Sequence, residues 1–193
     1  MTMTKTKTLL TLLSLTLLLP GAAMAEGKYQ VDPVHSTAIF KALHFGAGYT
    51  YGLFRKVEGS LTVDEKSPAK SSVSISFDAA SVYTGDQKRD KHLQSPDFLN
   101  AKQYPKITFK STRVVKTAGG ANVSGKLSLH GVTRDITVKM VKVGDGKDPW
   151  GNTRIGFEGT FSVKLSDHKI KGMKGAVGDK IQITIAVEGM KKS

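Results

Sequence analysis

The densest group of chemically active side chains in this chain is the run Arg89-Asp90-Lys91-His92. Two bases, a carboxylate and an imidazole within four positions could transfer protons or bind an anionic group. The function of this run depends on the helix or strand in which it lies, and the rest of the sequence predicts this secondary structure.

The remaining histidines give little support for a hydrolase or a metalloenzyme. Asp32, His35 and Ser36 have the side chains of a hydrolytic triad, but successive residues on a strand alternate faces, so their spacing alone does not assemble one. The sequence has no His-x-x-x-His zinc motif and no Gly-x-Ser-x-Gly nucleophile elbow. We therefore expect no enzyme, no catalytic residue, no metal site and no cofactor. One alternative stays open: a metal-binding or hydrolytic protein in which His35 and His44 meet across two strands.

The first 25 residues have the pattern of a secretory signal peptide. Lys5 and Lys7 supply a positive start, residues 9–19 supply an apolar core, and Ala23-Met24-Ala25 supplies a small-x-small cleavage site. An apolar core of this length is too short to span a bilayer, which needs about 20 residues. We expect cleavage after Ala25, a periplasmic location, and one domain over residues 26–193.

Composition narrows the classes of partner. The chain has no cysteine, which excludes disulfides, thiolate catalysis and cysteine-based zinc sites. Without the two signal-peptide lysines, 27 basic residues face 16 acidic ones, a formal charge of +11. This excess favours anionic partners, so a basic surface-binding module is a further alternative function. The lysines are scattered and alternate with apolar residues, however, which is typical of a solvated sheet face.

Apolar and polar residues alternate along most of the chain, which predicts antiparallel strands with one buried face. The longest stripe runs through Ile155, Phe157, Phe161 and Val163. The predicted strands cover residues 29–31, 37–45, 51–63, 73–77, 106–115, 123–130, 135–143, 155–165 and 181–188. A change of phase between Met140 and Val141 predicts a β-bulge.

About eight strands with glycines inside them predict an all-β fold that curls into an antiparallel, lipocalin-like barrel. A short helical connection is expected near residues 85–100. Thr84 and Gln87 fit a capping box, and Ser95-Pro96 fits a second helix start. On this interpretation Leu93, Phe98 and Leu99 close one end of the barrel. The alternation does not decide whether the barrel interior is open or filled.

The sequence resembles the YceI family of periplasmic, lipocalin-like barrels. The matching elements, in the order of the family, are Tyr29-Gln30-Val31-Asp32-Pro33-Val34-His35-Ser36, His44, Gly52-Leu53-Phe54, Gly59, Arg89-Asp90-Lys91-His92-Leu93, Asp97-Phe98, Tyr104-Pro105-Lys106-Ile107-Thr108-Phe109 and Gly125-Lys126-Leu127-Ser128-Leu129-His130-Gly131-Val132-Thr133. They span nearly the whole chain after residue 25. The chain departs from the family pattern at Leu165-Ser166-Asp167-His168-Lys169-Ile170.

The resemblance implies a barrel that binds, stores or transports a polyisoprenoid, an isoprenoid quinone or a similar long-chain amphiphile in its interior. The inward stripes then predict which residues contact the lipid tail: Phe40, Leu43, Phe45, Phe54, Phe77, Phe98, Phe109, Leu127, Ile155, Phe157, Phe161 and Ile183. Arg89, Lys91 and His92 are the candidates for contact with the head group.

Three further expectations concern partners. A basic module that binds nucleic acid would interleave cations with exposed aromatic residues. The aromatic residues here fall mostly on the presumed inner stripes, so we expect no nucleic acid. Weak contact with an anionic membrane surface is compatible with the charge, and the sequence leaves open whether the protein forms a homodimer.

Overall fold

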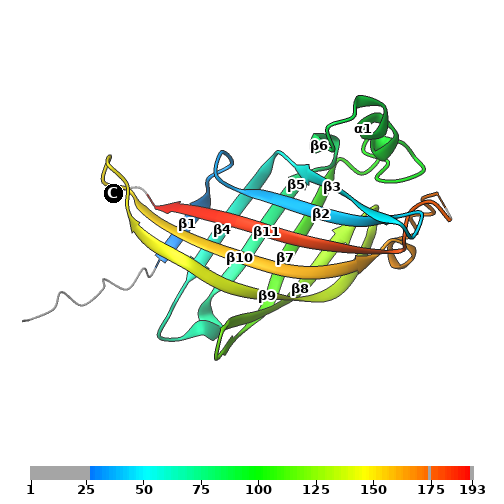
Figure 1. Ribbon diagram of the computed structural model, residues 1–193. Coiled ribbons are helices and arrows are strands. Elements are labelled where there is room, and N and C mark those ends of the chain that lie inside the picture. The colour runs from blue at the N-terminus through cyan, green and yellow to red at the C-terminus, as the bar shows by residue number, and fades with distance from the viewer. Residues whose placement is uncertain (1–26, 174, 192–193) are drawn as a thin grey trace, which may run out of the picture.

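The computed structural model describes residues 27–173 and 175–191, and the predicted signal peptide lies outside them. The described chain forms eleven strands, one short helix and three 3-10 turns (Figure 1). The elements are β1 (Gly27–Val31), β2 (Thr37–His44), β3 (Gly48–Phe54), β4 (Val57–Val63), η1 (Pro68–Lys70), β5 (Ser72–Asp78), η2 (Ala79–Ser81), β6 (Val82–Tyr83), α1 (Gln87–Gln94), β7 (Lys106–Thr117), β8 (Gly120–Leu129), β9 (Val132–Lys147), β10 (Thr153–Lys164), η3 (Ser166–His168) and β11 (Lys180–Lys191). Within the described ranges, no helix has the length and apolar character needed to cross a membrane.

Eight of the strands close into an antiparallel barrel. Their order is β1-β4-β5-β7-β8-β9-β10-β11, and β11 pairs back with β1 through Gln30 with Met190 and Val31 with Gly189. Closure pairs strands that would otherwise be exposed sheet edges. The eight-stranded, lipocalin-like barrel predicted from the sequence is confirmed.

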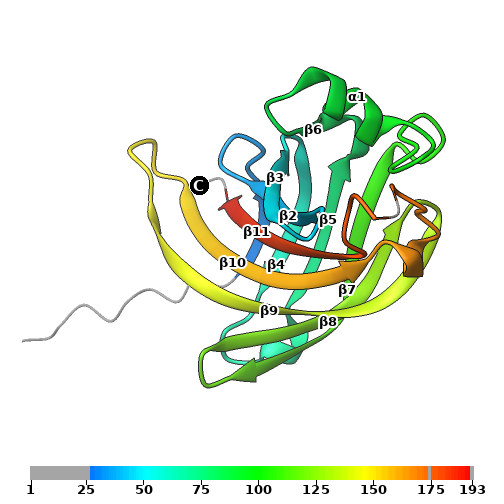
Figure 2. The same cartoon turned by 45° about the vertical axis from the view of Figure 1, so that its right-hand side comes forward.

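The other three strands form a layer along the first half of β11. Residues 182–186 of β11 pair with β2, which continues into β3 and then β6. Figure 2 shows α1 beside β6, at the same end of the barrel as the link between β10 and β11. This end contains most of the chain's irregular structure.

Alternation fixes which side chains face the interior. Ile155 and Val163 on β10 are buried, as are Ile185 and Val187 on β11, while the intervening Glu158 is exposed. Because the side-chain period of a strand is two, a slip of one residue would bring polar side chains inside. The hydrophobic pattern therefore sets the register of the barrel.

The single strand predicted over residues 51–63 is wrong. The chain leaves the β2 layer after Phe54 and joins the barrel at Val57, because β3 pairs with β2 and β6, whereas β4 pairs with β1 and β5. Arg55 and Lys56 make the change, and their amides donate hydrogen bonds to the carbonyl and hydroxyl oxygens of Ser81 at 3.4 and 3.3 Å. The sequence carried a sign of this corner, since Arg55 and Lys56 are successive polar residues and put Phe54 and Val57 three positions apart, out of phase.

The predicted bulge in β9 is present. Gly156 pairs with Gly144 and Phe157 with Lys142, so Val143 is the additional residue. The bulge lies after Lys142 and not between Met140 and Val141: Lys142 keeps the inward phase of Met140 and lines a cavity inside the barrel, while Val141 and Val143 are exposed. A second register shift, at Thr112 in β7, was not predicted.

The helical connection is present, but the predicted capping box at Thr84 is wrong. The N-cap of α1 is Asp86, whose carboxylate accepts a hydrogen bond from the Arg89 amide at 2.8 Å. The Thr84 hydroxyl donates instead to Asp90 at 2.6 Å. The predicted turn from Ser95 through Leu99 is present: the Ser95 hydroxyl accepts a hydrogen bond from the Asp97 amide at 3.3 Å, and the turn buries Phe98.

Candidate functional site

A cavity of about 180 Å³ lies inside the barrel at the end that α1 covers. Its walls come from the inward faces of strands, and its cover comes from α1, residues 98–99 and the link between β10 and β11. The lining residues are Ala38, Phe40, Ala42, Leu43, His44, Thr50, Phe54, Phe77, Val82, Arg89, Leu93, Phe98, Leu99, Ile107, Leu127, Leu129, Phe161, Val163, Leu165, Ile170, Val177, Ile181 and Ile183. Almost all are aliphatic or aromatic, so the chamber suits an apolar ligand group.

Three aromatic rings line one side of this cavity. Phe40 and Phe54 have ring centroids 5.9 Å apart, and Phe54 and Phe77 have centroids 6.0 Å apart. The rings come from β2, β3 and β5. Gly52 makes room for them, because a Cβ at this position would lie 2.3 Å from Cζ of Phe40.

Hydrogen bonds hold the cover of the cavity in place. The Phe45 amide donates to the Ala176 carbonyl at 2.8 Å, and the Gly178 amide donates to the Leu43 carbonyl at 2.9 Å. The Gly172 amide donates to the Asp97 carbonyl at 3.1 Å. The link between β10 and β11 is thus tied to the β2–β3 turn and to the segment that follows α1.

Thr84 anchors the helix itself. Arg89 donates from Nε to the Thr84 hydroxyl at 2.8 Å and from Nη2 to the Thr84 carbonyl at 2.9 Å. Asp90 accepts hydrogen bonds from the amide and hydroxyl of the same threonine. Arg89 and Asp90, the first two residues of the run that opened the sequence analysis, therefore hold α1 against the end of β6.

The predicted tail-contact residues divide into two groups. Eight of them line this cavity: Phe40, Leu43, Phe54, Phe77, Phe98, Leu127, Phe161 and Ile183. The other four do not. Phe45 is 66% exposed in the β2–β3 turn, so its prediction as a wall residue is wrong. Phe109 and Ile155 are buried in the core, and Phe157 lines a different cavity.

Of the three predicted head-group residues, the structure brings only Arg89 to the cavity. Lys91 lies on α1 but outside the lining. His92 points its Nε2 toward Oδ2 of Asp97, 3.2 Å away, and packs edge-on against Phe98 with ring centroids 5.0 Å apart. His92 thus supports the turn that buries Phe98.

Sequence reasoning missed the small residues and most of the loop residues of the wall. Ala38 and Ala42 share the inward phase of Phe40, so this phase could have identified them. Leu165, Ile170 and Val177 lie in segments without periodicity. Leu165 and Ile170 bound the segment in which the sequence departs from the family pattern, so this departure contributes directly to the cavity wall.

A second cavity, of about 350 Å³, lies at the opposite end of the barrel. Apolar residues such as Ile75, Val123 and Phe157 line its inner part. Charged residues lie nearer the η1 link, where Lys142 contacts Glu65 at 2.6 Å and also pairs with Asp145. The barrel interior therefore contains two separate apolar spaces.

A layer of side chains separates the two cavities. On four strands, the inward residue between the two sets of lining residues lines neither cavity: Phe109 on β7, Gly125 on β8, Gly159 on β10 and Ile185 on β11. A Cβ on Gly125 would lie 2.7 Å from Cζ of Phe109, so this glycine accommodates the aromatic ring. Phe109 and Ile185 are both buried and close the interior at this level.

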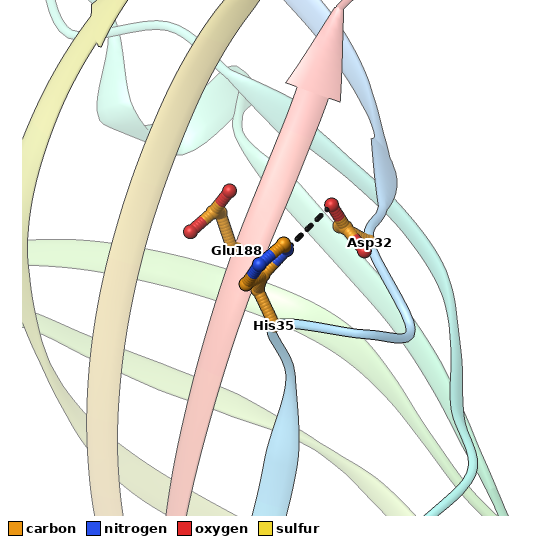
Figure 3. A group of neighbouring side chains, drawn as sticks. All are labelled: Asp32, His35 and Glu188. Carbon is orange, nitrogen blue, oxygen red and sulfur yellow. Dashed lines mark hydrogen bonds and ion pairs between the residues drawn. The ribbon is translucent and has the colours of Figure 1, made fainter. Parts of the chain in front are cut away.

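A polar cluster on the outward face of the barrel combines Asp32, His35 and Glu188 (Figure 3). One ligand atom from each lies within 4.8 Å of the others, a spacing that could hold a metal ion. Arg154, however, already forms ion pairs with Asp32 and, at 2.8 Å, with Glu188. Its Nε also lies 3.0 Å from Asp148. The guanidinium supplies the positive charge that a metal would bring.

The contacts within the cluster shift the pKa values of Asp32 and His35. Burial disfavours the Asp32 carboxylate, but hydrogen bonds from His35, Arg154 and the Val34 amide outweigh burial and hold its pKa well below its usual range. The hydrogen bond to Asp32 raises the pKa of His35. The cluster ties the β1–β2 link to β10 and β11, and sequence reasoning missed Arg154 and Asp148 because they lie more than a hundred residues from Asp32.

The histidine pair that could have held a metal does not form. His35 precedes β2 and His44 ends it, so the length of the strand separates them. His44 lines the first cavity, whereas His35 belongs to the outward cluster. The structure does not favour the alternative of a metal-binding or hydrolytic protein based on these two residues.

Comparisons with known proteins agree with the fold. The YceI-like domain family matches residues 29–189. Protein YceI of Escherichia coli O17:K52:H18 is 38% identical over 183 residues, covering 95% of this chain and 96% of that protein. The crystal structure of BcnA from Burkholderia cenocepacia superposes with a TM-score of 0.75 at 25% identity, covering 82% of this chain and 98% of that one. A polyisoprenoid binding domain from Saccharophagus degradans has a TM-score of 0.63 at 16% identity, covering 86% and 98%.

Proposed function

Because the chain belongs to the YceI-like family, we propose that it binds the tail of an isoprenoid lipid, or of a similar long-chain amphiphile, in the cavity that α1 covers. The observation that carries the proposal is the apolar lining of this cavity. The Saccharophagus domain, which shares the fold, is described as binding polyisoprenoid, and this description supports the same class of ligand.

The energetics favour a ligand chosen by shape. Burying a methylene group contributes about 0.8 kcal/mol, so a few isoprene units supply substantial affinity without a specific hydrogen bond. The phenylalanine rings and the β-branched residues of the wall fix the width of the chamber. Selection then acts on the length and girth of the tail more than on its chemistry.

Arg89 is the proposed partner of a polar head group. It lines the cavity, and its Nε and Nη2 already donate to Thr84, so its remaining guanidinium hydrogens are the donors left for a ligand oxygen. A quinone oxygen or a phosphate would suit such donors. Lys91 and His92 lie outside the lining and are not included in this proposal.

The proposed role is binding and carriage rather than catalysis. Arg89 and Asp90 hold α1 in place, and the charged residues of the outward cluster pair with one another. The signal-peptide pattern supports export of residues 26–193 to the periplasm.

The test is native mass spectrometry of residues 26–193 purified from the producing cell's envelope, followed by organic extraction and identification of any bound molecule. A bound isoprenoid or acyl chain in a one-to-one ratio is the expected result. A protein without bound lipid that also takes up no added quinone or polyprenol would refute the proposal.

A further inference from the structure

The turn between β2 and β3 combines exposed apolar residues with basic ones. Phe45 is 66% exposed at this turn, and Tyr49 is 58% exposed at the start of β3. Met173, in the link between β10 and β11, is 48% exposed. Together with Lys41, Lys169 and Lys171, these residues are called the tip surface below.

The tip surface is one place in the fold, although its residues lie far apart in the sequence. His44 and Val177 form a β-bridge, and the Phe45 amide donates to the Ala176 carbonyl. The Ala176 amide in turn donates to the Met173 carbonyl at 3.0 Å. Figure 1 shows the β2–β3 turn beside the link between β10 and β11 at the same end of the molecule.

Phe45 occupies an unfavourable backbone conformation in this turn. Its φ of 49° lies in the left-handed region, which bulky residues rarely adopt, and its ring gains little burial there. Its ring packs edge-on against His44, with centroids 4.4 Å apart. Neither packing nor turn chemistry accounts for a phenylalanine here, since Gly or Asn would fit the backbone better.

The two segments that form the tip surface carry cations and no carboxylate, although Asp97 lies beside the link between β10 and β11 and Asp167 lies within this link. Residues 41–49 and 169–178 contain no Asp or Glu. Nζ of Lys41 lies 4.2 Å from the centroid of the Tyr49 ring, which places a cation next to an aromatic face. Lys169 and Lys171 are exposed on the link between β10 and β11. Exposed apolar side chains among cations fit a surface that is apolar inside and anionic outside.

We propose that the tip surface docks the protein on an anionic lipid bilayer. Phe45 and Met173 enter the interface, Tyr49 lies at the level of the head groups, and the three lysines face the phosphates. His44, next to Phe45, lines the cavity beneath α1, so docking brings this cavity to the membrane. The inference concerns a different surface from the proposed tail-binding cavity, and each can be tested without the other.

The test is co-sedimentation of residues 26–193 with vesicles. One set contains phosphatidylethanolamine and phosphatidylglycerol, and the other contains phosphatidylcholine alone. We expect binding to the anionic vesicles only, and loss of this binding near 1 M salt, where the Debye length falls to about 3 Å. Equal binding to both kinds of vesicle, or to neither, would overturn the proposal.

Two variants test the location. Phe45→Asn with Met173→Ser should lower the bound fraction at least about fivefold by removing the apolar contacts. Replacing Lys41, Lys169 and Lys171 by Gln should lower it similarly and remove its salt dependence. Asparagine is chosen at position 45 because it tolerates a positive φ.

Matched controls lie at the opposite end of the barrel. Trp150→Ser removes an aromatic residue that is 79% exposed, and glutamine at Lys28, Lys66 and Lys70 removes the same charge. Both controls should bind as the unaltered protein does. If they lose binding as much as the tip variants, general charge or apolar exposure explains the binding and the proposal fails. It also fails if Phe45→Asn converts a dimer into a monomer, because the tip surface would then be an interface between copies.

Discussion

Replacing Phe109 with alanine should join the two cavities of the barrel. The ring lies in the layer that separates a chamber of about 180 Å³ from one of about 350 Å³, and Gly125 next to the ring offers no side chain to fill the gap. The ligand would then reach a space more than twice as large. The fold should lose about 3–5 kcal/mol of stability, the usual cost of truncating a buried phenylalanine, and urea unfolding measures this loss.

The change in affinity follows from the length of tail that can be buried. Each additional buried methylene contributes about 0.8 kcal/mol, which is roughly fourfold in affinity. In the unaltered protein, affinity should rise with chain length only until the first chamber is full. In Phe109→Ala it should continue to rise for at least one further isoprene unit, by at least about tenfold.

The assay is competition between geraniol, farnesol, geranylgeraniol and longer prenols, read by native mass spectrometry. Phe157→Ala is the matched control, since it removes an equal ring that lines only the second cavity. Ile185→Ala opens the same layer from β11 and should act as Phe109→Ala does. If both layer variants fold and show the same dependence on chain length as the unaltered protein, the division into two chambers does not limit the ligand.

Three further predictions concern the cover and the outward cluster. Asp86→Ala removes the N-cap of α1 and should cost about 1 kcal/mol in urea unfolding; no loss would mean that α1 does not depend on its cap. Arg89→Gln should weaken binding of a prenyl phosphate more than of the matching prenol in the same competition assay, and equal weakening would remove its head-group role. The pKa of Asp32 is lowered from 3.8 on folding, so the stability that its carboxylate contributes is fully present above pH 3.8 and is lost as the pH falls. The pKa of His35 is raised from 6.5 on folding, so the stability that its imidazolium contributes is fully present below pH 6.5. This stability is lost as the pH rises through the pKa of His35 in the folded protein. The unfolding free energy of Asp32→Asn should therefore approach that of the unaltered protein at low pH, and that of His35→Gln should approach it at high pH. Profiles that run parallel to that of the unaltered protein would contradict these two contributions.

Much of the barrel could be predicted because alternation is a local signal with a fixed period. The stripes of β10 and β11 were visible in the sequence, and their inward phase identified Phe161 and Ile183 as cavity residues. Alternation does not show where the chain changes the strands with which it pairs. The phase breaks between Phe54 and Val57, but the break alone does not show that the chain changes its pairing partners there.

The candidate site was harder to predict where its residues depend on long-range geometry. Phe45 ends the strand predicted over residues 37–45 in the phase opposite to Phe40, and in the structure it lies in the β2–β3 turn with its ring exposed. Phe109 is inward as expected, yet its position between two cavities follows from the register of four strands. Arg154 meets Asp32 across 122 positions, a pairing that local spacing cannot indicate.

The most direct test of the central claim is photo-crosslinking with an isoprenoid that carries a diazirine at the end of its tail. Peptide mass spectrometry of the irradiated protein then locates the tail. The proposed function predicts crosslinks to residues of the cavity beneath α1, such as Phe40, Phe77 and Phe161, and competition by unlabelled prenol. Crosslinks confined to the outward faces of the strands, without competition, would contradict binding inside the barrel.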